Sequence, residues 1–197
     1  MPRIVQLARP LLAALLLAGC AGPSHADLAV GAPAPDFTLK GLDGAEISLA
    51  GLRGKTVVLE WINPNCPVSR RHADAKTMVT TAAKHPQAVW LAINSTRADH
   101  QDYLAPADHQ KYNAERGIGY PVLYDASGQV GRAYGAKTTP HMYVIDPEGK
   151  LAYMGAIDDG PSGRAKTNYV DAALTALEQG KRPEPAVTKA YGCSVKY

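Results

Sequence analysis

One stretch in the first half of the chain constrains the fold more than any other. An apolar run of β-branched and aliphatic residues, 56–59, predicts a strand that is buried on both faces. The segment 63–65, Asn-Pro-Asn, is typical of a turn, and Cys66 and Pro67 then open a helix-like segment. Cys66 is therefore expected at a strand-to-helix corner, at the start of a helix.

Such a position favours a reactive thiol. Free backbone N–H groups and the positive end of the helix dipole stabilise a thiolate there, and Arg70 and Arg71 would add to this effect if they point toward the sulfur. A fall in the thiol pKa from ~8.5 to ~6 would make it roughly 90% ionised at pH 7. The alternative is a buried structural cysteine.

The N-terminal segment is typical of an export signal. Arg3 and Arg9 precede an apolar run, 11–17, that is too short to span a membrane. The following Leu-Ala-Gly-Cys, which ends at Cys20, resembles the lipobox of bacterial lipoproteins. That resemblance implies cleavage after residue 19, lipidation of Cys20 and, with Ala21 next, anchoring in the outer membrane. Cleavage after Ala26 to give a soluble exported protein is the alternative.

Composition excludes some functions and limits the cysteine chemistry. Without residues 1–19 the net charge falls from +3 to +1, so no basic surface argues for nucleic acid. If Cys20 carries lipid, Cys66 and Cys193 are the remaining thiols, in a compartment that permits disulfides. The length suits one domain. We expect a signal at 1–19, a tether at 20–32, a domain at 33–180 and a tail at 181–197.

The remaining pattern alternates between strand-like and helix-like segments. The order strand 56–61, helix 67–84, strand 88–94 predicts a βαβ unit with a parallel strand pair. The other predicted elements are a hairpin of 37–39 and 46–49 around Asp43-Gly44, a helix at 106–116, a strand at 119–125, a short helix at 128–135, a hairpin of 142–146 and 151–155, and a helix at 164–179.

Several motifs together resemble the thioredoxin fold, and within it the redoxin branch of peroxiredoxin-like and thioredoxin-like proteins of the AhpC/TSA kind. The residues that carry the resemblance are 34–39 (APDFTL), the corner 61–66, the segment 120–136 and the segment 138–149 with Thr-Thr-Pro and Val-Ile-Asp. The resemblance implies an α/β fold with a central mixed sheet, flanking helices and an N-terminal β-hairpin.

The resemblance also assigns a substrate groove. In this family the proline before the hairpin strand is cis and faces the active-site sulfur, and Pro140 takes that role here. A cis bond turns the chain sharply and leaves the backbone of Thr139 free to pair with a substrate strand. His141 could bind substrate or tune Cys66, or simply lie at the surface, and Trp61 is expected to pack beside the site.

Two departures from the family pattern affect the chemistry. Where thioredoxins have a second cysteine three residues after the first, this chain has Ser69, so Cys66 cannot be resolved within that motif. Where peroxiredoxins have threonine three residues before the cysteine, this chain has Asn63, and their later arginine is not evident.

Cys193 is the second thiol that could act at the site. Peroxiredoxin-like proteins often resolve an attacked cysteine with a remote one, so the resemblance implies a Cys66–Cys193 redox pair. A permanent structural disulfide and two unpaired thiols are the alternatives. His72 is predicted too far along its helix to touch Cys66, and Asp158 and Asp159 are predicted to be solvated turn residues.

The resulting hypothesis is an exported, lipid-anchored thiol–disulfide oxidoreductase or thiol antioxidant. Its partners would be a thiol or disulfide protein, or a peroxide, and an external thiol reductant; the membrane would be contacted only through the lipid. No organic cofactor is implied, and no metal-ligand spacing is present. The alternatives are a thiol peroxidase and a binding module that kept the fold but lost turnover.

Overall fold

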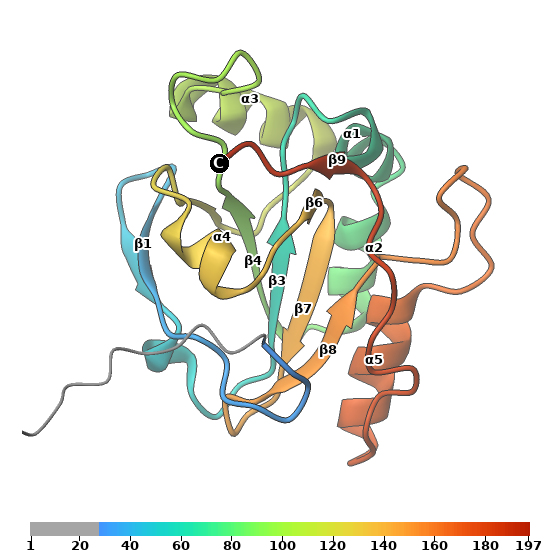
Figure 1. The fold of residues 1–197 in the computed structure, drawn as a ribbon. Helices are drawn as coiled ribbons and strands as arrows, with labels where there is room; N and C mark the ends of the chain where they lie inside the picture. The colour runs from blue at the N-terminus through green and yellow to red at the C-terminus, as the bar shows by residue number, and fades with distance from the viewer. Residues whose placement is uncertain (1–27) are drawn as a thin grey trace, which may run out of the picture.

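The computed structural model describes residues 28–197 and is built around one mixed sheet of seven strands in the order β2-β1-β5-β4-β3-β7-β8 (Figure 1). Central β3 pairs in parallel with β4 and antiparallel with β7. The strands are β1 (Thr38–Gly41), β2 (Glu46–Ser48), β3 (Val57–Trp61), β4 (Val89–Asn94), β5 (Val122–Tyr124), β7 (His141–Ile145) and β8 (Leu151–Gly155). The predicted N-terminal hairpin and parallel pair are confirmed.

Helices cover both faces of this sheet, which confirms the thioredoxin-like fold class. Side chains of β3 alternate between two cores: Leu59 and Trp61 pack toward α4, and Val58 packs toward α2 and α5. The helices are the 3-10 turn η1 (Ala50–Leu52), α1 (Pro67–Asp74), α2 (Thr77–Lys84), α3 (Pro106–Arg116), α4 (Gln129–Ala133) and α5 (Tyr169–Glu178).

The single helix predicted over 67–84 is wrong, because the structure divides it into α1 and α2. Lys76 adopts the left-handed conformation, with φ of 54°, and ends the first helix. Buried residues on α1 are Ser69 and His72, whereas those on α2 are Met78 and Thr81. Each half therefore buries its own pair of side chains.

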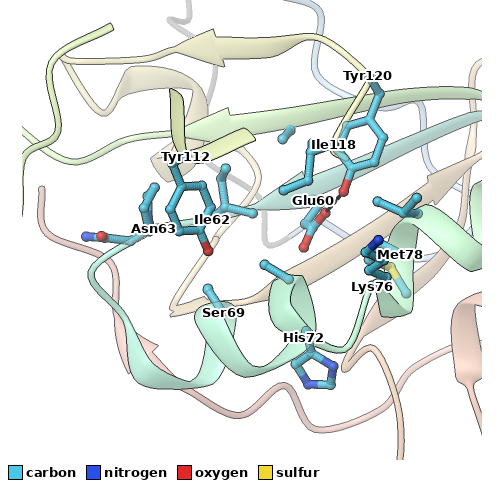
Figure 2. A pocket seen from close by; sticks show the side chains of 14 residues that line it. Glu60, Ile62, Asn63, Ser69, His72, Lys76, Met78, Tyr112, Ile118 and Tyr120 are labelled. Atoms are coloured by element: carbon cyan, nitrogen blue, oxygen red, sulfur yellow. Dashed lines mark hydrogen bonds between the residues drawn. The ribbon is translucent and has the colours of Figure 1, made fainter. Parts of the chain in front are cut away.

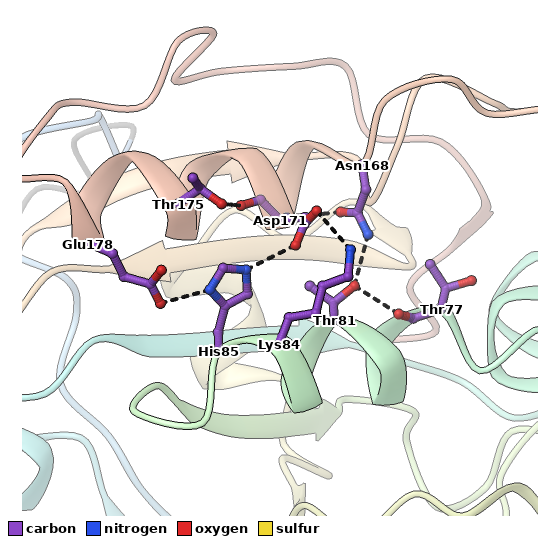
Figure 3. Close-up of polar contacts among 8 residues, drawn as sticks. All are labelled: Thr77, Thr81, Lys84, His85, Asn168, Asp171, Thr175 and Glu178. Carbon is purple, nitrogen blue, oxygen red and sulfur yellow. Dashed lines mark hydrogen bonds and ion pairs between the residues drawn. The ribbon is translucent and has the colours of Figure 1, made fainter.

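The last helix begins later than predicted, and a buried histidine joins it to α2. Asn168 caps α5 by accepting a hydrogen bond from the backbone N–H of Asp171 at 3.0 Å. His85, just after α2, lies between Asp171 and Glu178 of α5, at 3.0 Å and 2.7 Å (Figure 3). This contact fixes two helices on the same face of the sheet.

The tail does not extend into solvent but runs along the domain. It follows the edge of β8, where the Thr188 N–H donates to the Met154 carbonyl at 3.1 Å, and then crosses to the end of the sheet near α1 (Figure 1). There β9 (Cys193–Ser194) pairs antiparallel with β6 (Thr138–Thr139). The Tyr197 hydroxyl finally donates to the Ala136 carbonyl at 2.7 Å.

The predicted export signal, with Cys20, lies outside the described residues. Within residues 28–197, none of the helices has the length and apolar character that a membrane span requires.

Candidate active site

Cys66 occupies the corner that the sequence predicts. It is the N-cap of α1, directly before Pro67, and only 3% of its surface is exposed. Its thiol donates to the carbonyl oxygen of Thr139 at 3.0 Å. The Thr139–Pro140 peptide bond is cis. The predicted juxtaposition of the cysteine and the cis-proline loop is thus present.

The tail brings Cys193 to the same corner. In the β6–β9 ladder Cys193 is the direct partner of Thr139, the residue whose carbonyl accepts from Cys66. The two thiols lie within hydrogen-bonding reach of each other, and both are free in the described part of the chain. Two sulfur atoms 127 positions apart in sequence therefore share one site.

The surroundings make the two thiols ionise differently. Burial raises the pKa of Cys66, but hydrogen bonds from the Cys193 thiol and from backbone N–H groups, including that of Ser69, outweigh burial and lower it below its ordinary value. Burial and the neighbouring Cys66 raise the pKa of Cys193 to about 11. Of the two thiols, Cys66 is therefore the one that ionises more readily.

Helix α1 contributes an N–H group to each sulfur. The first-turn N–H of Ser69 lowers the pKa of Cys66, and that of Val68 lowers the pKa of Cys193 against the larger effect of burial. These groups have no partner inside a helix, so they are available to a negative sulfur. The helix start accommodates a dithiol pair although the chain has Ser69 where a second cysteine of the motif would stand.

A close backbone contact brings the tail against the cis-proline loop. Gly192 has φ of +143°, and a Cβ at this position would lie 2.2 Å from the carbonyl oxygen of Thr139. Only glycine permits this approach. The strand site next to Pro140, predicted to pair with a substrate strand, is occupied here by the protein's own tail.

The two arginines expected near the thiolate are directed to carbonyl oxygens. Arg70 donates to the Pro64 carbonyl at 3.2 Å and 3.3 Å, and Arg71 donates to the carbonyls of Gly160 and Pro161 at 3.2 Å and 2.9 Å. Neither guanidinium group is among the groups that lower the pKa of Cys66. Backbone N–H groups and the second thiol perform that task.

Trp61 and His141, the other two residues predicted beside the substrate site, are close to it in sequence, but their side chains contact other groups. Trp61 is fully buried, and its indole N–H donates to Ser95 at 3.0 Å, so it presents no surface to a substrate. The His141 Nδ1 lies 3.1 Å from the Tyr143 hydroxyl, and the ring packs on that of Tyr143. Burial and nearby Lys137 lower the pKa of His141 to about 4, so it is neutral at pH 7.

A narrow pocket lies on the other side of α1 (Figure 2). Glu60 of β3 points into it and accepts a hydrogen bond from the Tyr120 hydroxyl at 2.9 Å. Burial raises the pKa of Glu60 to about 7, against the smaller opposing effect of that bond. The buried hydroxyl of Ser69 faces the same pocket without a protein partner. The space, about 20 Å³, suits a single water molecule.

The sequence did not reveal how the tail is attached to α1. His72 lies 3.2 Å from the hydroxyl of Tyr191, which donates to Asp158. The prediction that Asp158 is a solvated turn residue is wrong, because the tail covers it and leaves it only 8% exposed. The signal that could have indicated this contact is the aromatic residue two positions before Cys193.

In residues 28–197, no group of three or more His, Cys, Asp or Glu side chains is arranged to hold a metal ion. The chemistry available to the described groups is that of the two thiols, which can exchange with a disulfide or react with a peroxide.

Comparison with known proteins agrees with this chemistry. Residues 30–154 match the AhpC/TSA family. The thiol-disulfide oxidoreductase ResA of Geobacillus thermodenitrificans is 29% identical over 124 residues, which are 63% of this chain and 67% of ResA. Peroxiredoxin tpx1 of Schizosaccharomyces pombe is 31% identical over 166 residues, which are 77% of this chain and 81% of tpx1.

Solved structures share the fold. A hypothetical protein of Sinorhizobium meliloti has a TM-score of 0.77 at 28% identity, covering 86% of this chain and 95% of its own. A secreted disulfide oxidoreductase of Mycobacterium tuberculosis, described as homologous to E. coli DsbE, has a TM-score of 0.50 at 27% identity, covering 58% of this chain and 79% of its own.

Proposed function

The chain belongs to the AhpC/TSA family, and from this premise we propose that it is a thiol–disulfide oxidoreductase in which Cys66 attacks and Cys193 resolves. The observation that carries the proposal is the convergence of both thiols at the start of α1, with a lowered pKa at Cys66 and a raised one at Cys193. A structural cysteine pair would not need this asymmetry.

The geometry supports a two-step exchange. The Cys66 thiolate attacks one sulfur of a substrate disulfide, forming a mixed disulfide, and the other substrate sulfur leaves as a thiolate that takes up a proton. Cys193 then loses its proton and attacks the Cys66 sulfur. The Cys66–Cys193 disulfide forms, the second substrate thiolate leaves, and an external dithiol reductant restores both thiols.

The first step prepares the second. In the reduced protein the negative Cys66 sulfur contributes to the high pKa of Cys193, beside the larger effect of burial. Once Cys66 is in a mixed disulfide it carries no charge, so this contribution disappears and the pKa of Cys193 falls. The N–H of Val68 then stabilises the new thiolate.

The test compares single-cysteine variants on a model protein disulfide. Cys66→Ser is expected to reduce turnover to the uncatalysed background. Cys193→Ser is expected to accumulate a mixed disulfide between Cys66 and the substrate, detectable by mass spectrometry of the alkylated protein. Retention of turnover by Cys66→Ser would overturn the proposal, and turnover without accumulation in Cys193→Ser would remove the resolving role.

A peroxidase is the second candidate, favoured by the 31% identity to peroxiredoxin tpx1. Here the Cys66 thiolate would cleave the O–O bond of the peroxide, becoming a sulfenic acid and releasing an alcohol from an alkyl hydroperoxide or water from hydrogen peroxide. The Cys193 thiol would then condense with the sulfenic acid, forming the disulfide and releasing one water. The discriminating measurement is the second-order rate constant of Cys66 oxidation by hydrogen peroxide. A rate no greater than that of a free thiolate would exclude a peroxidase.

The place of action is also a proposal: the periplasmic side of the cell envelope, with Cys20 lipidated and anchored in the outer membrane. It is supported by the charged and apolar N-terminal pattern that ends at Cys20 and by the similarity to a secreted oxidoreductase. Mass spectrometry of the mature N-terminus from native membranes tests it. A mature chain that starts at an unmodified Asp27 would contradict the lipid anchor.

A further inference from the structure

The tail segment before Cys193 is held by a chain of three side-chain hydrogen bonds that begins on α1. The His72 Nδ1 lies 3.3 Å from the Thr77 hydroxyl, and the His72 Nε2 lies 3.2 Å from the Tyr191 hydroxyl. The Tyr191 hydroxyl also donates to the Asp158 carboxylate, beyond the end of β8. Helix, tail and loop are thereby connected through one tyrosine.

The direction of each bond follows from the last one. Since the Tyr191 proton goes to Asp158, the tyrosine oxygen can only accept from His72, so the Nε2 of His72 carries hydrogen. Its Nδ1 then accepts from the Thr77 hydroxyl. Burial lowers the pKa of His72, and nearby Arg71 lowers it further, against the opposing effect of Asp158. A neutral imidazole at pH 7 satisfies every bond in the chain.

The surroundings keep Tyr191 protonated in this role. Burial raises its pKa, and the hydrogen bond to Asp158 raises it further, while Arg71 opposes both. The Arg71 guanidinium lies 6.0 Å from the centre of the tyrosine ring. Asp158 keeps a second partner, the backbone N–H of Gly160 at 2.9 Å. The Tyr191 hydroxyl thus acts as a fixed bridge rather than as an acid or base.

The bridge formed by the Tyr191 hydroxyl with His72 and Asp158 bears on the reaction because it connects the tail to the helix of Cys66. His72 belongs to α1, whose N-cap is Cys66, so the tail is anchored to the same rigid element that carries the nucleophile. Tyr191 precedes Cys193 by two residues, and Gly192 between them is pressed against Thr139. The chain after Cys193 is held separately, by the two-residue strand β9, by backbone hydrogen bonds of Val195 and Lys196, and by the Tyr197 hydroxyl, so the bridge at Tyr191 anchors the segment before Cys193.

We propose that Tyr191, held by His72 and Asp158, is the positioning residue that keeps Cys193 within reach of Cys66. This inference rests on the proposed function, since it concerns the resolving step. Without the bridge the tail would still follow β8 as far as Thr188, but the segment from there to Cys193 would sample more conformations. The effective concentration of Cys193 at Cys66 would fall accordingly.

The test is the equilibrium between the dithiol and the Cys66–Cys193 disulfide in glutathione buffers, for wild-type protein and Tyr191→Phe. The variant keeps the ring and removes only the hydroxyl. We expect about a tenfold lower equilibrium constant for the internal disulfide, which corresponds to about 30 mV. Tyr103→Phe, on the loop before α3, removes a hydroxyl that makes no hydrogen bond to the described tail; it is the matched control and should leave the constant unchanged.

A second measurement separates positioning from a general disturbance of the site. In a Cys193→Ser background, Tyr191→Phe should leave the alkylation rate of Cys66 by a small reagent within about twofold, because the hydroxyl acts through the tail. His72→Phe should lower the disulfide equilibrium in the same direction. The double variant should be no worse than either single one, since both remove the same bridge.

The outcomes distinguish the two levels of the proposal. If wild-type protein forms no Cys66–Cys193 disulfide, the proposed function fails, and the role of Tyr191 fails with it. If wild-type protein forms the disulfide and Tyr191→Phe forms it equally well, only the positioning role is overturned. Additive effects of Tyr191→Phe and His72→Phe would likewise contradict a shared bridge.

Discussion

Two sulfur atoms of the same chemical type behave differently because their neighbours differ. At Cys66, the neighbouring second thiol and backbone N–H groups lower the pKa, and together they outweigh the burial that raises it. Cys193 has burial and a negative neighbour, and its pKa rises to about 11. In the proposed mechanism these residue-level contacts set the order of reaction, with attack by Cys66 and resolution by Cys193.

This asymmetry predicts the effect of two replacements at position 193. Cys193→Ala removes the donor to the Cys66 sulfur, so the pKa of Cys66 should rise. Cys193→Ser keeps a donor, so the rise should be smaller. Because the pKa of Cys66 is lower in the folded protein than in the unfolded chain, its thiolate stabilises the fold at high pH. That stabilisation is lost as the pH falls through the folded pKa, and Cys193→Ala should make the loss smaller.

The measurement is the rate of Cys66 alkylation against pH in each variant, with the midpoint giving the pKa. A midpoint that does not move in Cys193→Ala would contradict the hydrogen bond between the thiols. An equal rise in both variants would assign the effect to something other than the lost donor.

At the scale of elements, the sequence predicted what depends on local patterns. The parallel pair, α3, the second hairpin and the Cys66 corner follow from apolar runs, prolines and glycines that act over a few residues. The break at Lys76 was not predictable, because the sequence has no glycine or proline there and a lysine rarely adopts the left-handed conformation. The burial of Asp158 depends on the tail, which is remote in sequence.

The contact between α2 and α5 allows a prediction with a built-in comparison. His85 is 4% exposed and bonds two carboxylates, so His85→Ala should lower the free energy of unfolding by about 2–4 kcal/mol through a cavity and lost bonds. The exposed neighbour Lys84 pairs with Asp171 at 3.2 Å, and Lys84→Ala should cost less than about 1 kcal/mol.

Chemical denaturation of both variants, read at one pH, measures these free energies. The alkylation rate of Cys66 should stay the same in each, because this contact lies on α5 and not at the start of α1. Equal losses for His85→Ala and Lys84→Ala would mean that burial of the histidine does not determine the stability of this helix pair.

At the scale of the whole molecule, one buried carboxyl links stability to pH. Burial raises the pKa of Glu60 to about 7 from an ordinary value of 4.5. The protonated Glu60 side chain therefore contributes to the free energy of unfolding fully below pH 4.5, and this contribution is lost as the pH rises through 7. Glu60→Gln removes this loss, so the variant should match wild type at pH 4 and exceed it by up to about 3 kcal/mol at pH 8.

Urea unfolding at a series of pH values measures the difference between the two proteins. Glu46→Gln, at an exposed position on β2, is the control and should give a nearly flat difference. A Glu60→Gln difference that does not grow between pH 4 and pH 8 would contradict a protonated Glu60 in the folded protein.

The attachment of the tail to the sheet end has a consequence for the life of the oxidised protein. In the loop-closure model, a disulfide stabilises the folded state by removing entropy from the unfolded chain. A disulfide that closes a loop of four residues contributes about 2 kcal/mol, whereas one that spans 127 positions contributes about 5 kcal/mol. Oxidation would therefore turn most of this domain into a covalent ring. Resistance to unfolding, and hence to proteolysis, would rise and fall with each redox cycle.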